Sequence, residues 1–379
     1  MVRLGDIATY INGYAFKPTD WSSEGVPIIR IQDLTGNSYQ ANRYNGKYDA
    51  KYEVNYGDVL ISWSASLGVY VWEGEKAVLN QHIFKVQFDK ADIDRDFFVH
   101  QVGCILNNAS GEAHGATMKH LTKPVFDALL FYLPTIEDQK KIANELNKVS
   151  DLISLRKQQL SKLDELVKSR FIELFGNIKN NHQRYPVIKI GSCAKLQGGF
   201  AFKSSNYLND GIRLVQISNV NKYTLDWDSI NCVPQAFLQK YKDFELHVGD
   251  LVLAMTRPVI KSLDAVKIAT VSENDVPSLL NQRVGRFVVD RKKLHSVYLM
   301  VLCQMPEFRE YVEAMSGNSL QPNISSKQVE DYSIVLPPLT LQEQFAAFVK
   351  QIDKSKFEIQ KSLEKLETLK KALMQKYFG

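Results

Sequence analysis

The chain has 379 residues, of which 45% are hydrophobic and 23% charged, and its net charge is +5. This length suits two or three domains, and the composition excludes an intrinsically disordered chain. The charge is compatible with a nucleic-acid partner but identifies none, since residues 1–133 carry 12 Lys and Arg against 15 Asp and Glu, whereas residues 177–335 carry 19 against 15.

Residues 1–133 form the first predicted domain, of mixed α+β type. The β-rich runs VPIIRIQ, DVLISW and HIFKVQF alternate with Gly, Asn and Asp turns, and a helix is expected near 95–108. The opening MVRLGDIATYINGY has no basic-then-apolar signal region, and no apolar run approaches the roughly 20 residues needed to cross a bilayer. We therefore expect a cytoplasmic protein.

A long helix is predicted within residues 134–176. From Ile136 to about Phe175 there is no Pro or Gly, and Pro134 and Gly176 flank the segment as helix boundaries often are. Apolar residues recur every seven positions, which is a heptad pattern. These residues are Leu146, Ile153, Leu160, Val167 and Leu174, interleaved with Ile142, Val149 and Leu163 and with the basic exceptions Arg156 and Arg170.

Residues 177–335 repeat the order of the first domain. GYAFK at 13–17 returns as GFAFK at 199–203, and the same offset aligns LGDIA with IGSCA and EGVPIIRIQDL with DGIRLVQISNV. Further on, YGDVLIS matches VGDLVLA, LNQHI matches LNQRV, and FYLP matches IVLP. The unchanged order of the blocks indicates a duplicated domain, with helix expected again near 296–315.

The second copy also ends in a predicted long helix, within residues 336–379. Its heptad residues are Phe345, Ile352, Ile359, Leu366 and Leu373, with Val349, Leu363 and Tyr377 between them and Lys356 and Lys370 as basic exceptions. Because neither helix can bury its apolar stripe alone, we expect an antiparallel coiled coil between the two. The basic side chains would then lay their stems along the groove and extend their charges into water. The alternative is that each helix packs on its own domain.

This twofold series of blocks and helices resembles the specificity subunits of type I restriction-modification systems. The resemblance covers essentially the whole chain. It rests on the openings LGDIATYINGYAFK and IGSCAKLQGGFAFK, the strands after GD, the LNQ blocks, and the helix entries LPTIEDQKKIA and LPPLTLQEQFAAF. It implies an α+β fold of two target-recognition domains, residues 1–133 and 177–335, separated by two spacer helices, residues 134–176 and 336–379.

The same resemblance implies the partners. Such a subunit binds double-stranded DNA and two adenine-methyltransferase subunits, and restriction subunits join to cleave DNA. The chain itself is expected to be non-catalytic and to hold no cofactor, with S-adenosylmethionine, ATP and Mg²⁺ on the partner subunits. In agreement, the only Pro-Pro pair lies in LPPL rather than in an [NDS]-P-P-[FYW] methyltransferase motif, and neither G-x-x-x-x-G-K-[ST] nor HExxH occurs.

Two diverged readers predict a bipartite, asymmetric DNA target, because identical readers would favour a palindrome. Strand alternation across residues 28–32 places Arg30 and Gln32 on a polar face, and Gln216 and Ser218 take these places in the second copy. Arg can bridge guanine and Gln can bridge adenine, so these are candidate base readers. The alternative is that they belong to solvated strand faces.

Blocks that both copies share are candidates for holding phosphate independently of sequence. These residues are Lys17, Asn80 and Gln81 in the first copy and Lys203, Asn281 and Gln282 in the second, and Arg283, which follows the second LNQ, is a further DNA-binding candidate. Loops after the GD strands add Trp63, Arg257 and Lys261, and weaker candidates are Gln321 and Asn323 near Lys119 and His120. The neighbouring aromatic residues Tyr14, Phe16, Phe200 and Phe202 are expected in the core.

Competing interpretations remain at the level of the sequence. A specificity subunit could serve a methylation-only system or one that cleaves differently, and an unrecognised enzyme could assemble its site in space. A coiled-coil scaffold with two protein-binding heads would show no salt-dependent DNA affinity. The four cysteines, Cys104, Cys193, Cys232 and Cys303, form no CxxC pair and are expected to be buried thiols.

Overall fold

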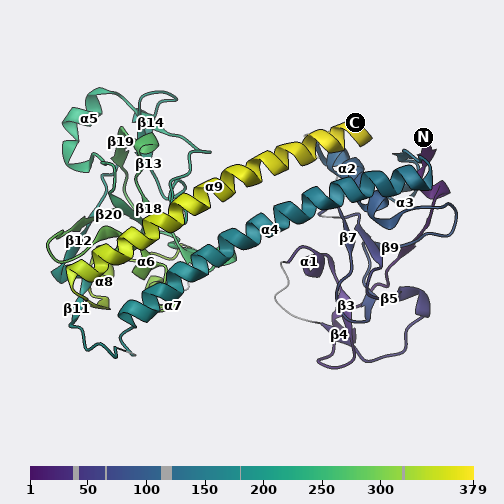
Figure 1. The fold of residues 1–379 in the computed structure, drawn as a ribbon, viewed down its shortest axis with the longest axis horizontal. Helices are drawn as coiled ribbons and strands as arrows, with labels where there is room; N and C mark the ends of the chain where they lie inside the picture. Colours follow the sequence, from purple (N-terminus) through teal and green to yellow (C-terminus); the bar gives the residue numbers. More distant parts are fainter. Residues whose placement is uncertain (37–41, 65, 112–121, 180, 318–320) are drawn as a thin grey trace. The chain divides into compact units, whose positions relative to one another are not determined.

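The computed structural model describes residues 1–36, 42–64, 66–111, 122–179, 181–317 and 321–379. It divides into unit 1, comprising Met1–Lys157 and Gln360–Gly379, and unit 2, comprising Gln158–Ile359. The two predicted long helices are confirmed as α4 (Ile136–Phe175) and α9 (Leu339–Phe378), the longest helices in Figure 1. Each of them contributes one part to unit 1 and the other part to unit 2.

Unit 1 is built on a four-stranded antiparallel sheet of order β2-β9-β6-β7. A second sheet has the order β4-β3-β8-β5, in which β3 and β8 run parallel, and β1 pairs with β10. The strands are β1 Val2–Arg3, β2 Thr9–Asn12, β3 Val26–Ile29, β4 Arg43–Tyr44, β5 Glu53–Val54, β6 Val59–Ser62, β7 Gly68–Val71, β8 Ala77–Leu79, β9 Ile83–Gln87 and β10 Leu130–Phe131, and the helices are α1 Ile31–Leu34, α2 Arg95–Gly111 and α3 Lys123–Asp127.

Unit 2 repeats this plan with sheets of order β12-β20-β15-β18 and β14-β13-β19, and with a β11-β21 pair. It adds the hairpin β16-β17. The strands are β11 Val187–Lys189, β12 Ala194–Gly198, β13 Ile212–Val215, β14 Cys232–Val233, β15 Leu251–Ala254, β16 Val259–Ile260, β17 Ala265–Val266, β18 Ile268–Thr270, β19 Ser278–Leu280, β20 Val284–Val289 and β21 Ser333–Val335, and the helices are α5 Ala236–Lys240, α6 Ser296–Cys303, α7 Pro306–Ser316 and α8 Ser326–Glu330.

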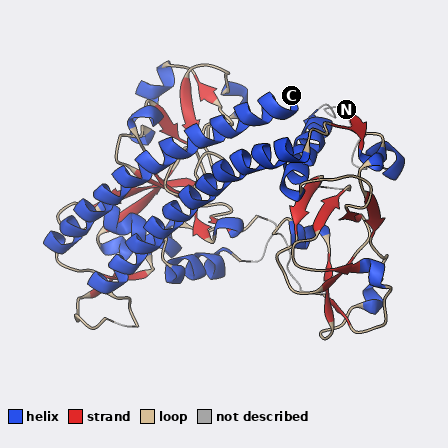
Figure 2. Cartoon of the chain, turned by 45° about the vertical axis from the view of Figure 1, so that its right-hand side comes forward, coloured by secondary structure: helices blue, strands red, loops and turns tan. Residues whose placement is uncertain are grey.

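The strand orders confirm the duplicated mixed α+β fold. Strands β2, β9, β6 and β7 have the same neighbours as β12, β20, β15 and β18, and the parallel pair β3-β8 corresponds to β13-β19. The predicted helices near 95–108 and 296–315 are α2 and the successive α6 and α7. Figure 2 shows the strands in red within each unit, with the helices in blue.

The two long helices run antiparallel within each unit. In unit 1, the early α4 residues Ile142, Leu146 and Val149 share a core with Leu373 near the end of α9. In unit 2, Phe171 and Phe175 near the end of α4 contact Phe345 at the start of α9, with ring centroids 5.6 and 5.3 Å apart. Both helices also pack on sheet residues, so the coiled coil and its alternative are each realised in part.

One basic heptad residue departs from the expectation that such side chains extend their charges into water. Lys356 does not extend into water but forms an ion pair with Asp164 of α4, and its side chain is only 22% exposed. Lys370 is half-buried, and this burial, together with Lys157, lowers the pKa of its ammonium. A partly buried carboxylate therefore compensates the charge of Lys356.

The alternation predicted across residues 28–32 and their counterparts is wrong. Strand β3 ends at Ile29, Arg30 caps the N-terminus of α1, and Gln32 lies in that helix. In the second copy β13 ends at Val215, so Gln216 and Ser218 lie in the turn that follows. The physical reason is that β3 and β13 have strands on both sides and bury consecutive residues, as interior strands beside a parallel neighbour do.

The cysteines and the aromatic residues of the repeated blocks lie mostly, but not all, in the core. Cys193, Cys232 and Cys303 are buried as expected, whereas Cys104 is only half-buried, and all four thiols are free. Phe16 and Phe202 belong to the core, but Tyr14 is 47% exposed. Over the described ranges, no helix is both long and apolar enough to cross a membrane.

Candidate nucleic-acid interface

A tight backbone junction holds together the GYAFK and LNQ blocks of unit 1. Gly13 follows β2 and donates a backbone hydrogen bond to the Ile83 carbonyl at 3.1 Å, and the Tyr14 amide donates to the Leu79 carbonyl at 2.8 Å. The Gln81 amide returns a bond to the Tyr14 carbonyl. A Cβ on Gly13 would lie 2.0 Å from the Asn80 carbonyl oxygen, so only glycine permits this approach.

Unit 2 builds the same junction from the second copies of these blocks. The Gly199 amide donates to the Val284 carbonyl, and the Phe200 amide donates to the Leu280 carbonyl. The amide of Gln282 closes the junction on the Phe200 carbonyl at 2.8 Å, and a Cβ on Gly199 would lie 2.1 Å from the Asn281 oxygen. The repeated blocks are thus conserved between the units because they make the same backbone contacts.

The residue that follows each LNQ sequence has a left-handed backbone conformation. His82 has φ 72° and Arg283 has φ 66°, and neither is a glycine. Their carbonyls accept hydrogen bonds from the first residues after the GD strands, Trp63 at 3.2 Å and Met255 at 2.7 Å. Non-glycine residues in this region are strained and gather at functional sites, so these turns are candidate contact points.

In unit 2 the junction assembles a group of exposed polar and basic side chains. The Arg257 amide donates to the Pro322 carbonyl at 2.8 Å, and Thr256 hydrogen-bonds Asn323. An Nη atom of Arg283 lies 3.4 Å from the Gln321 side-chain oxygen. The structure therefore brings together Arg257, Arg283, Gln321 and Asn323, which the sequence scatters over residues 257–323, and we call these four residues the unit 2 loop cluster.

The β16-β17 hairpin places further cations beside this cluster. Lys261 is exposed at its turn, and Lys267 follows β17 with its amide donating to the Pro258 carbonyl. Burial, together with the nearby Arg257 charge, lowers the pKa of the Lys267 ammonium. A phosphate brought to this surface would relieve the repulsion between these cations.

Unit 1 presents different chemistry at the corresponding place. The Trp63 indole donates to the Asn12 side-chain oxygen at 3.2 Å, lies 4.9 Å from the His82 ring, and stacks on Phe84 at 5.6 Å. Trp63 is therefore held by its neighbours and is only partly exposed. Lys119 and His120, the weaker candidates of this unit, lie outside the described residues.

The other candidates lie at several separate places. Lys17 and Lys203 are exposed before the short 3-10 helices Pro18–Asp20 and Ser204–Asn206, away from any ion pair that the structure describes. Gln282 is exposed, Gln81 and Asn80 are partly buried, and Asn281 is buried. The buried position of Asn281 fits a role in the junction better than one in direct contact with DNA.

The predicted base readers are engaged within the protein. Arg30 pairs with Asp33 at 3.6 Å and lies over the Trp21 ring. Gln216 accepts from the Asn231 amide at 2.7 Å and donates to the Tyr207 hydroxyl at 3.3 Å. Gln32 is exposed on α1 and remains available for contact.

Two glutamines that are not among the sequence candidates attach the starts of the long helices to the units by hydrogen bonds. Gln139 of α4 accepts from the Asp94 amide at 2.9 Å and donates to the Asp92 and Pro134 carbonyls. Gln342 of α9 does the same with His295, Lys293 and Pro337. The signal was present, since both glutamines stand five residues after the proline of the shared LP block.

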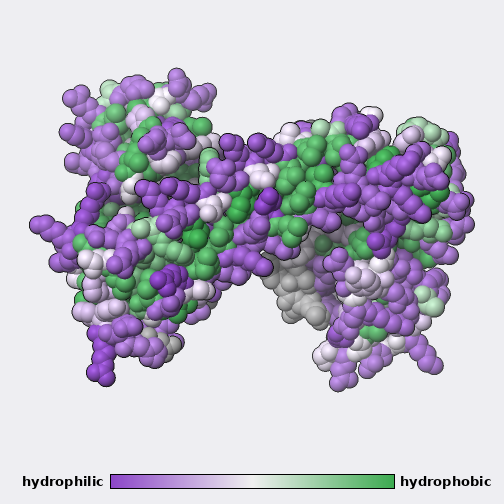
Figure 3. Space-filling model, in the orientation of Figure 1, coloured by the Kyte–Doolittle hydropathy of each residue, from purple (hydrophilic) through white to green (hydrophobic). Residues whose placement is uncertain are grey.

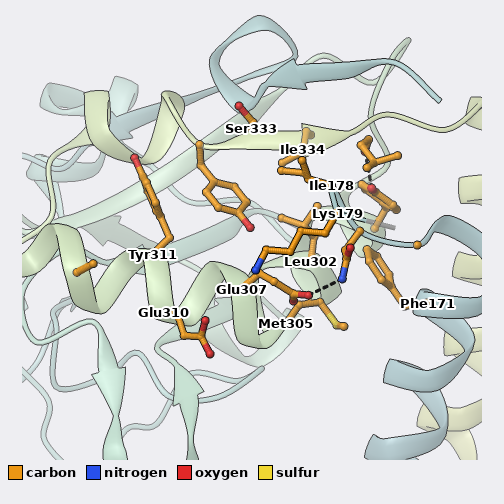
Figure 4. Close-up of a pocket in the computed structure, with 16 residues that line it drawn as sticks. Phe171, Ile178, Lys179, Leu302, Met305, Glu307, Glu310, Tyr311, Ser333 and Ile334 are labelled. Atoms are coloured by element: carbon orange, nitrogen blue, oxygen red, sulfur yellow. Dashed lines mark hydrogen bonds between the residues drawn. The ribbon is translucent and has the colours of Figure 1, made fainter. Parts of the chain in front are cut away.

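An apolar hollow of about 470 Å³ also lies in unit 2, where α4 ends. Figure 4 shows Phe171, Leu302 and Ile334 around it, with the carboxylates of Glu307 and Glu310 nearby, and Glu307 accepts from Asn177 at 2.7 Å. Apolar walls with two carboxylates and a single ammonium group, that of Lys179, do not suit phosphate. Within the described ranges, no group of three His, Cys, Asp or Glu side chains could hold a metal ion.

The fold is duplicated, Lys17 and Lys203 are exposed at matching turns, and further exposed cations gather in unit 2, so these loops are the candidate nucleic-acid contacts of the two units. A family model described as the type I restriction modification DNA specificity domain matches residues 1–165 and 182–371. The chain belongs to this family. The two matched segments agree with the internal repeat.

Individual relatives extend over nearly the whole chain. The MjaVIII type I restriction enzyme specificity subunit of Methanocaldococcus jannaschii is 27% identical, over 99% of this chain and 90% of the relative. The EcoBI specificity subunit of Escherichia coli is 20% identical, over 100% and 85%. The crystal structure of a type I S subunit from M. genitalium shares the fold with a TM-score of 0.55, at 14% identity and with 100% and 95% coverage.

Proposed function

We propose that this chain is the sequence-reading, non-catalytic subunit of a type I restriction-modification complex. Each unit would read one half of a bipartite, asymmetric DNA target, and the chain would direct partner subunits that methylate adenine and cleave DNA. The observation that carries this proposal is the repeated junction with diverged side chains. At matching positions of the junction, unit 1 presents Trp63 and His82 whereas unit 2 presents Met255 and Arg283, with Arg257 two residues after Met255.

This arrangement separates two tasks that DNA reading requires. The junction backbone is common to both units and can place each unit on the DNA, while unlike side chains can select unlike bases. Arginine offers bidentate hydrogen bonds to guanine, whereas a partly exposed tryptophan offers an apolar contact. Unlike half-sites follow directly from unlike loops.

The long helices offer an exposed apolar surface for partner subunits. Large apolar side chains are exposed on both helices, where green patches follow the helices in Figure 3. They are Leu152, Leu155, Leu166 and Ile172 of α4 and Phe357 and Leu369 of α9, with Phe357 the most exposed at 66%. Exposed apolar groups in such number support a protein partner, for which we propose the methyltransferase subunits. The methyltransferase and restriction subunits together, rather than this chain, would carry S-adenosylmethionine, ATP and Mg²⁺.

The decisive experiment co-expresses this chain with a type I methyltransferase subunit and maps N6-methyladenine across the host genome. A new asymmetric motif in two parts, separated by a fixed gap, would support the proposal and identify the target. A complex that forms but leaves no motif would favour the scaffold interpretation. The Phe357→Asp variant should lose co-purification with the methyltransferase, whereas Gln360→Asp, an exposed change on the same helix, should retain it.

A further inference from the structure

A polar cluster joins the second recognition domain to both long helices. We define the Asp164 cluster as Asp164 of α4, Lys356 of α9, and Lys222 and Tyr223 of the loop after β13. One Asp164 carboxylate oxygen lies 2.8 Å from the Lys222 Nζ, and the other contacts the Lys356 Nζ. All four residues belong to unit 2.

Burial distinguishes this cluster from ordinary surface ion pairs. The side chains of Asp164, Lys222 and Lys356 are 27%, 23% and 22% exposed. Both ammonium groups also lie over the Tyr223 ring, at 5.0 and 5.5 Å from its centroid. Partial burial and cation–π contact strengthen such pairs relative to exposed ones, which contribute little.

The loop that carries Lys222 is itself held firmly on the central sheet. Tyr223 has a left-handed backbone with φ 71°, and its amide donates to the Ile268 carbonyl at 2.8 Å. Its carbonyl accepts from the Thr270 amide, so it extends the edge of β18. Lys222 therefore connects a rigid sheet edge to the helix pair.

The internal repeat places different residues in unit 1 at the positions that match Lys222 and Lys356. The offset that aligns GYAFK with GFAFK places Gly36 opposite Lys222, and the offset that aligns Gln139 with Gln342 places Ile153 opposite Lys356. Asp164 corresponds to Glu367, which instead pairs with Lys157 at 3.3 Å, with both side chains at least half exposed. Within the part of the chain that the structure describes, the cluster thus occurs in the second domain alone.

We propose that Lys222 is a positioning residue that fixes the rotation of the second recognition domain on its stretch of α4 and α9, and thereby the number of unread base pairs between the half-sites. This inference rests on the proposed function. Successive phosphates along one DNA strand are about 3.4 Å apart, so a small rotation of a reading domain shifts it by a whole base pair. A domain released from the Asp164 cluster would also read targets whose half-sites are separated by one base pair more or fewer.

The experiment maps N6-methyladenine with wild-type chain and with Lys222→Met, each in complex with the methyltransferase subunit. We expect both half-sites to stay unchanged while sites with one base pair more or fewer between them gain about tenfold in relative methylation, equivalent to roughly 1.4 kcal/mol. Lys222→Arg, which keeps the cation, should restore the single gap. Lys157→Met, which removes the exposed pair of unit 1, should behave as wild type.

Several outcomes would overturn the inference. It is wrong if Lys222→Met, shown to be folded by its thermal unfolding, retains one gap length as sharply as wild type. Asp164→Asn removes the shared carboxylate charge and provides a second variant, which must broaden the gap in the same way. A wild-type complex that yields no two-part motif would instead contradict the proposed function, and the two failures are therefore distinguishable.

Discussion

Gly199 lies so close to the Asn281 carbonyl that the second junction has no room for a side chain. We expect Gly199→Ala to destabilise unit 2 by about 2–3 kcal/mol, because the added Cβ meets backbone that cannot rotate away. Urea unfolding followed by Trp227, the single tryptophan of unit 2, measures this loss. At neighbouring Gly198 a Cβ would meet nothing within 4 Å, so Gly198→Ala should stay within about 1 kcal/mol.

Arg283 combines a left-handed backbone with an exposed guanidinium in the unit 2 loop cluster. If it holds a phosphate, Arg283→Ala should lower the slope of log affinity against log salt by about 1 and weaken DNA binding by the complex on every sequence. Fluorescence anisotropy across a salt series measures both. Arg291→Ala removes another exposed arginine of unit 2 and should leave the slope unchanged. Equal slopes for wild type and Arg283→Ala would exclude a phosphate contact.

For single residues, the sequence identifies candidate side chains by their chemistry but does not reveal what each one contacts. Arg257, Gln321 and Asn323 are separate candidates in the sequence, and the structure joins them through the Pro322 backbone carbonyl and the Thr256 side chain, contacts that no spacing reveals. Gln216 was selected as a reader, yet its amide is held between Asn231 and Tyr207. Whether a polar side chain points to solvent depends on partners that are distant in sequence.

Each long helix is held at its start by one buried glutamine. Gln342→Ala would leave the His295 amide and the Lys293 and Pro337 carbonyls without this partner, and unsatisfied buried groups are costly. We expect a loss of about 3 kcal/mol in the unfolding free energy of unit 2. Trp227 fluorescence in urea provides the measurement, with the exposed Gln344→Ala as control. Equal midpoints for the two variants would contradict the role given to Gln342.

The Asp164 cluster should also shape the acid stability of unit 2. Burial alone would raise the pKa of Asp164, but hydrogen bonds from Lys222 and Lys356 hold it below its ordinary value of 3.8. A carboxyl with a lowered pKa contributes stability that is present above its unfolded value and is lost as pH falls through its folded one.

We therefore expect Asp164→Asn to be less stable than wild type at neutral pH, and this difference to shrink as pH falls below 3.8. Thermal unfolding monitored by Trp227 at a series of pH values tests this expectation. Asp228→Asn, at an exposed carboxylate of unit 2, should show little difference from wild type at any pH. A stability difference for Asp164→Asn that does not change with pH would show that the charge is irrelevant.

Among the structural elements, the two long helices can be predicted from the sequence because heptads and flanking Pro and Gly residues are local patterns. The heptads and flanking Pro and Gly residues placed α4 and α9 almost to the residue. Strand β3 was extended too far because VPIIRIQ continues the β-rich composition past Ile29. What ends the strand is the cap on α1, where the Arg30 amide donates to Asp33 at 2.8 Å, a contact formed only in the folded turn.

For the whole molecule, the duplicated fold predicts independent reading by the two domains. Replacing residues 1–133 with the matching region of another specificity subunit should change one half of the methylated motif and leave the other half intact. Methylome mapping of the exchanged chain provides the test, and a second exchange of residues 177–335 provides the reciprocal control. A change in both halves after either exchange would show that the domains do not read separately.

The sequence by itself determined the duplication, the two long helices and the family, because repeated blocks and heptads are properties of residue order. Only the tertiary structure decided which candidates lie together, which glutamines pin the helices, and that Lys356 pairs with Asp164 instead of reaching water. The physical reason is that burial and hydrogen-bond partners arise between segments far apart in the chain, such as Arg283 and Gln321. No local pattern in the sequence marks these contacts, because they form only when the sheets bring the loops together.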